Sequence, residues 1–190
     1  MMTYSQFVSV VSKDLFRAIK NNKEEYDNFI AFWDDDRELV ISFKINRYKN
    51  LVRNFYIQAE SSDNEIEGLI ELNPLRVPES YNELLAEIKE TLRHEIEHVC
   101  QFTNKNKEQY ERFISVPFYR YLMLRHEVPA YVRGLYTRAK TEKKPLKEVI
   151  EHHFKMYNNH FQNEDEINEV RSVWYDYATN NKLLTIRKIL

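Results

Sequence analysis

The spacing of hydrophobic residues changes near Asn73, and this change constrains the fold more than any other feature of the chain. Before it, hydrophobic and polar residues alternate in three short runs, as they do in strands with one buried face. These runs cover residues 39–45, 51–59 and 66–72. After Asn73, Pro74 and Pro78, hydrophobic residues recur at every third or fourth position, which predicts helices.

The order of these patterns predicts the fold class. One amphipathic helix is expected before the strands, over residues 4–20, and residues 105–126 are expected to be irregular or short-helical. Four further helices are expected near residues 80–104, 127–143, 145–160 and 164–179. The strands have short polar connections, which favours an antiparallel meander. We therefore predict an α+β fold, with an N-terminal helix and a small antiparallel sheet followed by a C-terminal helical bundle.

The composition fits one globular domain over residues 1–190. The chain is 43% hydrophobic and 14% aromatic, which is enough for a sizeable core and too apolar for a disordered chain. Its two glycines, Gly68 and Gly134, are too far apart to form a phosphate-binding loop or a dinucleotide-binding turn. Cys100 is the single cysteine, which excludes an intrachain disulfide and every cysteine-rich zinc module.

Charge and hydropathy give expectations about partners and location. The net charge of −2 provides no basic field for nucleic acid or anionic lipid. No apolar stretch approaches the eighteen residues of a membrane span, and the N-terminus has no secretory pattern. We expect a cytoplasmic protein that binds neither nucleic acid nor membrane.

The segment Leu92–Val99 reads LRHEIEHV and carries the clearest chemical signal. His94 and His98 are four residues apart, so a helix presents both imidazoles on one side to a single ion. This is the HExxH arrangement, in which two histidines bind zinc and the intervening Glu95 is the general base. On a helical wheel the two histidines fall at the margin of the apolar face, where water can enter.

A catalytic zinc site needs a third protein ligand, and two neighbouring residues are candidates. Glu127 is the stronger one, because it shares a helix face with Ala130, Tyr131 and Gly134. The small residues of that face would allow a close approach to the HExxH helix. The alternatives are that Glu127 is an ordinary solvated glutamate, or that His126 is the ligand. Pro129 disfavours helical geometry at Val128, which would leave Glu127 at the very start of its helix.

The HExxH motif and the downstream Glu-x-x-Ala-Tyr resemble the zincin metallopeptidases, in the gluzincin-like group that includes small phage and bacterial ImmA/IrrE-like peptidases. The resemblance covers these two motifs and the strand-then-helix order. It implies a zinc-dependent hydrolase acting on a protein or peptide substrate, with His94, His98 and Glu127 as metal ligands and Glu95 as base. The metzincin class is excluded, since its further glycine and histidine are replaced by Gln101 and Asn104.

Further roles follow as expectations. Tyr131, or one of Tyr119 and Tyr121, would stabilise the oxyanion. The strand at Glu67–Glu71 would pair with an extended substrate, or would be an ordinary sheet strand. His152, His153 and His160 are expected to be solvated or hydrogen-bonded helix residues, with a proton donor among them as the alternative. The competing hypothesis for the whole chain is a zincin-derived protein that binds a metal or a partner without catalysis.

Overall fold

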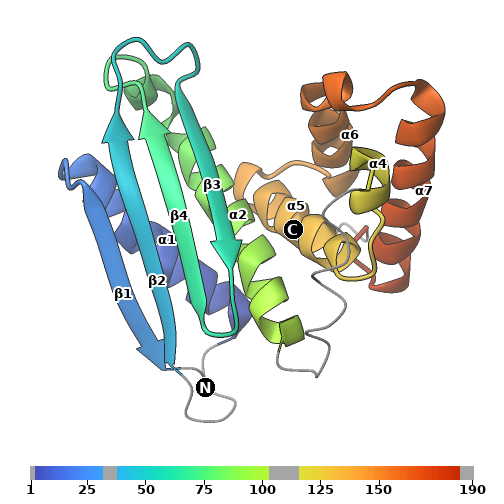
Figure 1. The fold of residues 1–190 in the computed structure, drawn as a ribbon, viewed down its shortest axis with the longest axis horizontal. Coiled ribbons are helices and arrows are strands. Elements are labelled where there is room, and N and C mark those ends of the chain that lie inside the picture. The colour runs from blue at the N-terminus through green and yellow to red at the C-terminus, as the bar shows by residue number, and fades with distance from the viewer. Residues whose placement is uncertain (1–2, 32–37, 103–115, 185–190) are drawn as a thin grey trace.

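The α+β class is confirmed by the structure, a computed structural model that describes residues 3–31, 38–102 and 116–184. Four strands and the α-helices of these ranges make up a sheet half and a helical half (Figure 1). In chain order the elements are α1 (Tyr4–Lys20), β1 (Glu25–Ala31), β2 (Glu38–Arg47), β3 (Phe55–Ser61), β4 (Glu65–Leu72), the 3-10 helix η1 (Val77–Ser80), α2 (Tyr81–Phe102), α4 (Phe118–Tyr121), α5 (Glu127–Glu142), α6 (Leu146–Met156), the 3-10 helix η3 (Asn158–His160) and α7 (Glu164–Asn180).

The sheet is mixed rather than wholly antiparallel, which corrects the predicted meander. Its strand order is β1-β2-β4-β3, and β2 pairs with β4 in parallel while the two outer pairs are antiparallel. The chain leaves β2 through residues 48–54 and forms β3 one strand position further out. The tight turn at 62–64 then returns β4 into the gap between β2 and β3 (Figure 1).

Two strand assignments therefore change. β1 was not predicted, because the polar segment Glu25–Ala31 lacks the clear alternation of the other strands. The predicted run 51–59 begins later, at Phe55, and continues through Ser61, beyond its predicted end. In the observed strand order, β3 is an edge strand of the sheet and β4 is internal.

Gly68 in β4 is required by the parallel pairing. The register places it opposite Phe43 of β2, and residues opposite each other point to the same face. A Cβ atom on Gly68 would lie only 2.2 Å from Cε1 of Phe43 and 2.9 Å from the carbonyl oxygen of Gln58. The Phe43 ring thus occupies the space over Gly68 that a side chain would need.

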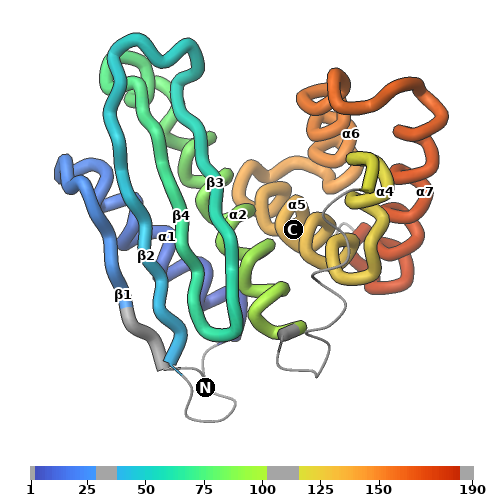
Figure 2. The backbone as a smooth tube through the Cα atoms, in the orientation of Figure 1, coloured from blue at the N-terminus to red at the C-terminus, as the bar shows by residue number. Residues whose placement is uncertain are grey.

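Two hydrophobic cores build the molecule. The first lies between one face of the sheet and helices α1 and α2, and the second lies among α4, α5, α6 and α7 (Figure 2). The halves meet where α2 packs along α5. Gly134 permits this contact, because a Cβ atom there would be 3.0 Å from the backbone oxygen of Glu90. The predicted close approach of the two helices is therefore present.

The helix boundaries follow from local signals. Thr3 caps α1 through a reciprocal capping box with Gln6, and Asn163 caps α7 by accepting a hydrogen bond from the Glu166 backbone. Helix α6 ends at Met156, earlier than predicted, so His160 lies in η3 and not on the same helix as His153. The predicted segments at 103–104 and 105–115 lie outside the described residues.

None of the helices in the described ranges combines the length and the apolar character that crossing a membrane requires.

Candidate metal centre

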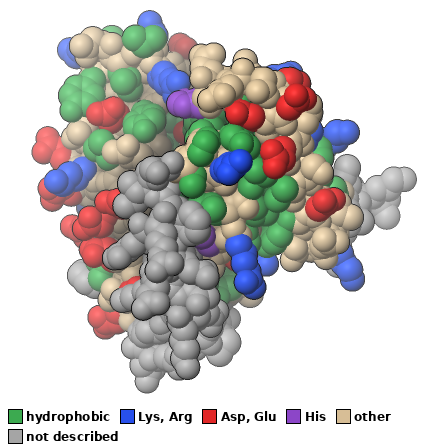
Figure 3. All heavy atoms as spheres, turned by 45° about the vertical axis from the view of Figure 1, so that its right-hand side comes forward, with side chains coloured by type: hydrophobic (Ala, Val, Ile, Leu, Met, Phe, Trp, Pro, Cys, Tyr) green, Lys and Arg blue, Asp and Glu red, His purple; other side chains and the backbone are tan. Residues whose placement is uncertain are grey.

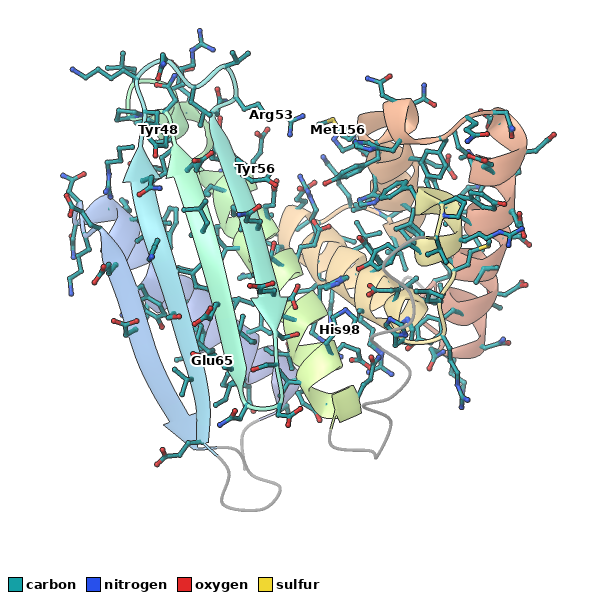
Figure 4. All side chains as sticks on the ribbon, in the orientation of Figure 1. Tyr48, Arg53, Tyr56, Glu65, His98 and Met156 are labelled. Carbon is teal, nitrogen blue, oxygen red and sulfur yellow. The ribbon has the colours of Figure 1, made fainter. Side chains whose placement is uncertain are left out.

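Helix α2 presents the two histidines of the HExxH motif towards α5. The Nε2 atoms of His94 and His98 lie 3.0 Å apart, and the rings are edge to face. His98 projects from α2 into the boundary between the two halves (Figure 4). At this separation one ring can donate a hydrogen bond to the other, and two neutral imidazoles with both Nε2 atoms unprotonated can instead bind one shared cation.

Glu127 reaches the same point from the first residue of α5. Its Oε2 atom lies 3.6 Å from Nε2 of His94 and 3.4 Å from Nε2 of His98. Pro129 is the third residue of α5, a position where its missing N–H costs no helical hydrogen bond. The helix therefore begins at Glu127, and Pro129 does not displace the carboxylate from the cluster.

The three atoms are spaced as the ligands of a tetrahedral zinc ion would be. Zinc bound at 2.0–2.1 Å with tetrahedral angles separates its ligand atoms by about 3.3–3.4 Å. The separations of 3.0, 3.4 and 3.6 Å bracket this value. In addition, Oε2 of Glu127 is buried and has no hydrogen-bond partner of good geometry among the described residues. The donor set of two imidazoles and one carboxylate fits zinc, and three ligands leave a position for water.

The electrostatics of the cluster also favour a cation. Burial raises the pKa of Glu127, but the contact with His98 and the charges of the two imidazoles outweigh burial and hold this pKa below its usual value. Burial and the neighbouring charge of His98 lower the pKa of His94 to about 3, so its imidazole is neutral at neutral pH. Burial lowers the pKa of His98, but Glu127 raises it above normal by a larger amount. The Glu127 carboxylate is thus anionic and stabilises positive charge beside it, while the His94 imidazole is neutral and can bind a cation.

Glu95 lies beside the cluster without joining it. Its Oε1 atom is 3.9 Å from Nε2 of His94, and its Oε2 atom accepts a 2.8 Å hydrogen bond from the hydroxyl of Ser61. Burial raises the pKa of Glu95 to about 7, although the charge of His98 and the Ser61 hydrogen bond lower it. A carboxyl with a pKa near neutrality can both accept and return a proton. Ser61 was not predicted as a site residue, since it lies beyond the predicted strand 51–59.

Gln101, one turn after His98, supports the cluster from behind. Its Oε1 atom lies 3.3 Å from Nδ1 of His98, and its amide nitrogen donates to the backbone oxygen of His126 at 3.1 Å. An acceptor at Nδ1 places the ring proton there and leaves Nε2 free to bind a metal. The same side chain ties α2 to the start of α5. Only the helical spacing of residues 98 and 101 could have indicated this role.

The predicted tyrosines occupy different places. The ring of Tyr131 packs edge-on against His94, with centroids 4.6 Å apart, and Tyr121 packs edge-on against Tyr131 at 6.4 Å. Burial is the main cause that raises the pKa of the hydroxyls of Tyr121 and Tyr131, and the nearby charge of Glu127 raises both further. Tyr119 instead accepts a hydrogen bond from the exposed Arg120.

The remaining histidines lie outside the three-residue cluster, which among the described residues comprises His94, His98 and Glu127. Nε2 of His126 is 3.5 Å from Oε1 of Glu127. His94 and His98 instead lie near the other carboxylate oxygen, Oε2. His152 is exposed, and His160 packs against Phe118. Histidine side chains are visible at the surface between the two halves (Figure 3).

His153 is half-buried on α6, and its Nε2 atom is inaccessible to solvent. Its ring packs against Tyr131, Tyr157 and Trp174, and its Nε2 atom has no hydrogen-bond partner among the described residues. Burial lowers the pKa of His153 to about 3. It is neither solvated nor hydrogen-bonded through Nε2, which differs from the expectation.

The strand beside the metal cluster is β3, not the predicted segment Glu67–Glu71. That segment belongs to β4, which β2 and β3 enclose on both sides. A separate depression of about 570 Å³ lies over outward-facing residues of the sheet, among them Asp27, Lys44 and Glu67. It contains no residue of the cluster and is not the candidate site.

Comparisons of this chain with protein-family models, with curated proteins and with solved structures give no match. The interpretation of the site therefore depends on its residues and their geometry.

Proposed function

We propose that the protein is a zinc-dependent peptidase of the HExxH type. The observation that carries this proposal is the placement of Glu95, whose carboxylate lies between the ligand atoms of the cluster and the edge strand β3. A zinc site that only stabilises a fold has four protein ligands and no need of a general base. Here three ligand atoms converge and a buried carboxyl with a pKa of about 7 stands next to them.

His94, His98 and Glu127 would hold the ion. When bound, zinc supplies a water molecule with a pKa of about 7 and polarises a carbonyl group. Glu95 takes the proton of the attacking water and returns it to the leaving amine, for which one side chain with a near-neutral pKa suffices. The hydroxyls of Tyr131 and Tyr121 are candidates for stabilising the charge that develops on the substrate oxygen, because burial keeps them protonated.

A peptide substrate is favoured by the sheet edge beside Glu95. β3 pairs with β4 on one side, and its other edge faces the boundary with the helical half (Figure 1). An exposed strand edge binds extended peptides through main-chain hydrogen bonds. A protein or peptide is therefore the class of substrate that the site fits.

The test compares the wild type with Glu95→Gln, loaded with one equivalent of zinc, on a mixture of denatured proteins analysed by mass spectrometry. Glutamine has nearly the same shape but cannot take the proton, so we expect an activity loss of roughly 10²–10⁴-fold with zinc content unchanged. Glu83→Gln, the same substitution at an exposed position of α2, is the matched control and should retain activity.

Equal activity of wild type and Glu95→Gln would refute the mechanism. If both are inert on every substrate while binding zinc tightly, the competing hypothesis of a non-catalytic metal-binding protein is favoured.

A further inference from the structure

Ser61 connects the edge strand to the proposed base. It is the last residue of β3, and its hydroxyl donates a 2.8 Å hydrogen bond to Oε2 of Glu95, 34 positions further along the chain. Glu95 is only 7% exposed, so water cannot replace this donor freely. The other carboxylate oxygen, Oε1, is the one near Nε2 of His94. The two oxygens of Glu95 thus have different partners.

The backbone of Ser61 faces the opposite way from β4. In an antiparallel ladder, hydrogen-bonded pairs alternate with pairs whose N–H and C=O groups point outward. The backbone N–H of Ser62 donates to the oxygen of Glu65 at 2.9 Å, so the next pair, Ser61 and Ile66, is an outward-pointing one. At the other end of β3, the N–H of Asn73 donates to Asn54 at 2.9 Å, which gives the same alternation. The outward set therefore includes Ile57, Ala59 and Ser61.

Ser61 consequently faces two parts of the site, one through its main chain and one through its side chain. Its main chain lies on the strand edge where an extended peptide would pair, and its side chain holds the base. We propose, on the basis of the proposed function, that Ser61 is a positioning residue that keeps Oε1 of Glu95 directed at the metal cluster while its own backbone binds the substrate main chain.

The alternative role of the hydrogen bond is to fasten β3 to α2, and the two roles predict different effects of removing the hydroxyl. A fastening bond contributes to stability and to the integrity of the site as a whole. A positioning bond affects the orientation of Glu95, so its loss lowers kcat more than it changes KM. Threonine keeps the hydroxyl and is the conservative variant.

The experiment uses the full chain with one equivalent of zinc and the peptide that the wild type cleaves fastest in the denatured-protein mixture. Ser61→Ala is expected to lower kcat about tenfold and to change KM less than about twofold. Ser61→Thr keeps the hydroxyl and should have a kcat close to that of the wild type. Ser62→Ala, an exposed neighbour, is the matched control. As a readout besides activity, each variant is loaded with Co²⁺ and its visible spectrum recorded. Ser61→Ala should change the spectrum, whereas Ser61→Thr and Ser62→Ala should not.

The outcomes separate this proposal from the proposed function. If Glu95→Gln is inactive but Ser61→Ala has wild-type kcat and spectrum, the peptidase stands and the positioning role is wrong. If Ser61→Ala loses metal or unfolds, the hydrogen bond is a fastening one and the proposal is also wrong. If the wild type cleaves nothing, the peptidase fails, and the Co²⁺ spectrum alone decides whether Ser61 orients Glu95.

Discussion

Gln101 contacts Nδ1 of His98 through one end of its amide and the backbone oxygen of His126 through the other. This side chain therefore contacts a proposed metal ligand on α2 and the backbone at the beginning of α5, where Glu127, the next proposed ligand, lies. Partners of this kind set the ring orientation and the proton position of a ligating histidine.

We expect Gln101→Ala to weaken zinc affinity about 10–100-fold without abolishing binding, because the ligands remain but their orientation is lost. The measurement is competition with a chromogenic chelator. Gln101→Glu keeps an acceptor for Nδ1 and should lose less affinity than Gln101→Ala. Equal affinities of wild type and Gln101→Ala would contradict this role.

Removal of a ligand should have a larger effect. We expect about one equivalent of zinc in the wild type and a strong loss in His98→Ala and Glu127→Ala, since each removes one of about three protein ligands. Metal content after dialysis, measured by mass spectrometry, checks this. His126→Ala is the matched control, because its ring contacts the other oxygen of Glu127. A larger loss of zinc in His126→Ala than in Glu127→Ala would show that His126, and not Glu127, is the third ligand.

Gly68→Ala is expected to destabilise the protein by about 1–3 kcal/mol, because the added methyl group overlaps the ring of Phe43. Urea unfolding measures the loss. The double variant with Phe43→Leu provides the control, since a smaller side chain at residue 43 makes room for the methyl group. The two substitutions should therefore cost less together than the sum of the single effects. Strict additivity would show that the overlap is relieved in some other way.

His153 predicts a pH dependence of stability. Burial lowers its pKa to about 3 in the folded protein, against 6.5 for an ordinary histidine. Between these values the unfolded chain binds a proton and the folded one does not, so stability is full above the unfolded pKa and falls as the pH decreases. We expect this histidine to contribute a loss of about 1 kcal/mol between pH 6.5 and 5.5.

His153→Phe should remove that contribution, and urea unfolding at both pH values, with a chelator present, measures the difference from wild type. His152→Phe, on the exposed side of the same helix, is the matched control and should keep the wild-type slope. A His153→Phe protein as sensitive to pH as the wild type would show that His153 titrates normally.

The helices and the convergence of His94, His98 and Glu127 were predictable because their signals are largely local. A period of 3.6 residues identifies α1, α2, α5, α6 and α7, and the spacing of His94 and His98 needs only a helix to bring the rings together. Glu127 required more, namely a close helix contact, and the small residues Ala130 and Gly134 indicated it. Burial of these two residues agrees with that inference.

The order of the strands was not predictable in the same way. Alternation identifies a strand and its buried face, but it carries no information on which strand lies beside it. Consecutive strands are usually neighbours, and here the parallel pairing of β2 with β4 breaks that rule. Gly68 was the available signal, since a glycine inside a strand often marks close approach of a neighbouring side chain. Ser61 and Gln101 were missed because their partners are set by that tertiary arrangement.

The two hydrophobic cores have one consequence for how the protein would respond to its surroundings. The two histidine ligands belong to α2, which is part of the first core, and Glu127 belongs to α5, which is part of the second. A bound ion would therefore act as a cross-link between two separately packed bodies, and its binding energy would add to their docking. Depletion of zinc would then weaken the joint between sheet and helices, so that a bound ion would affect the docking of the two halves in addition to the proposed chemistry.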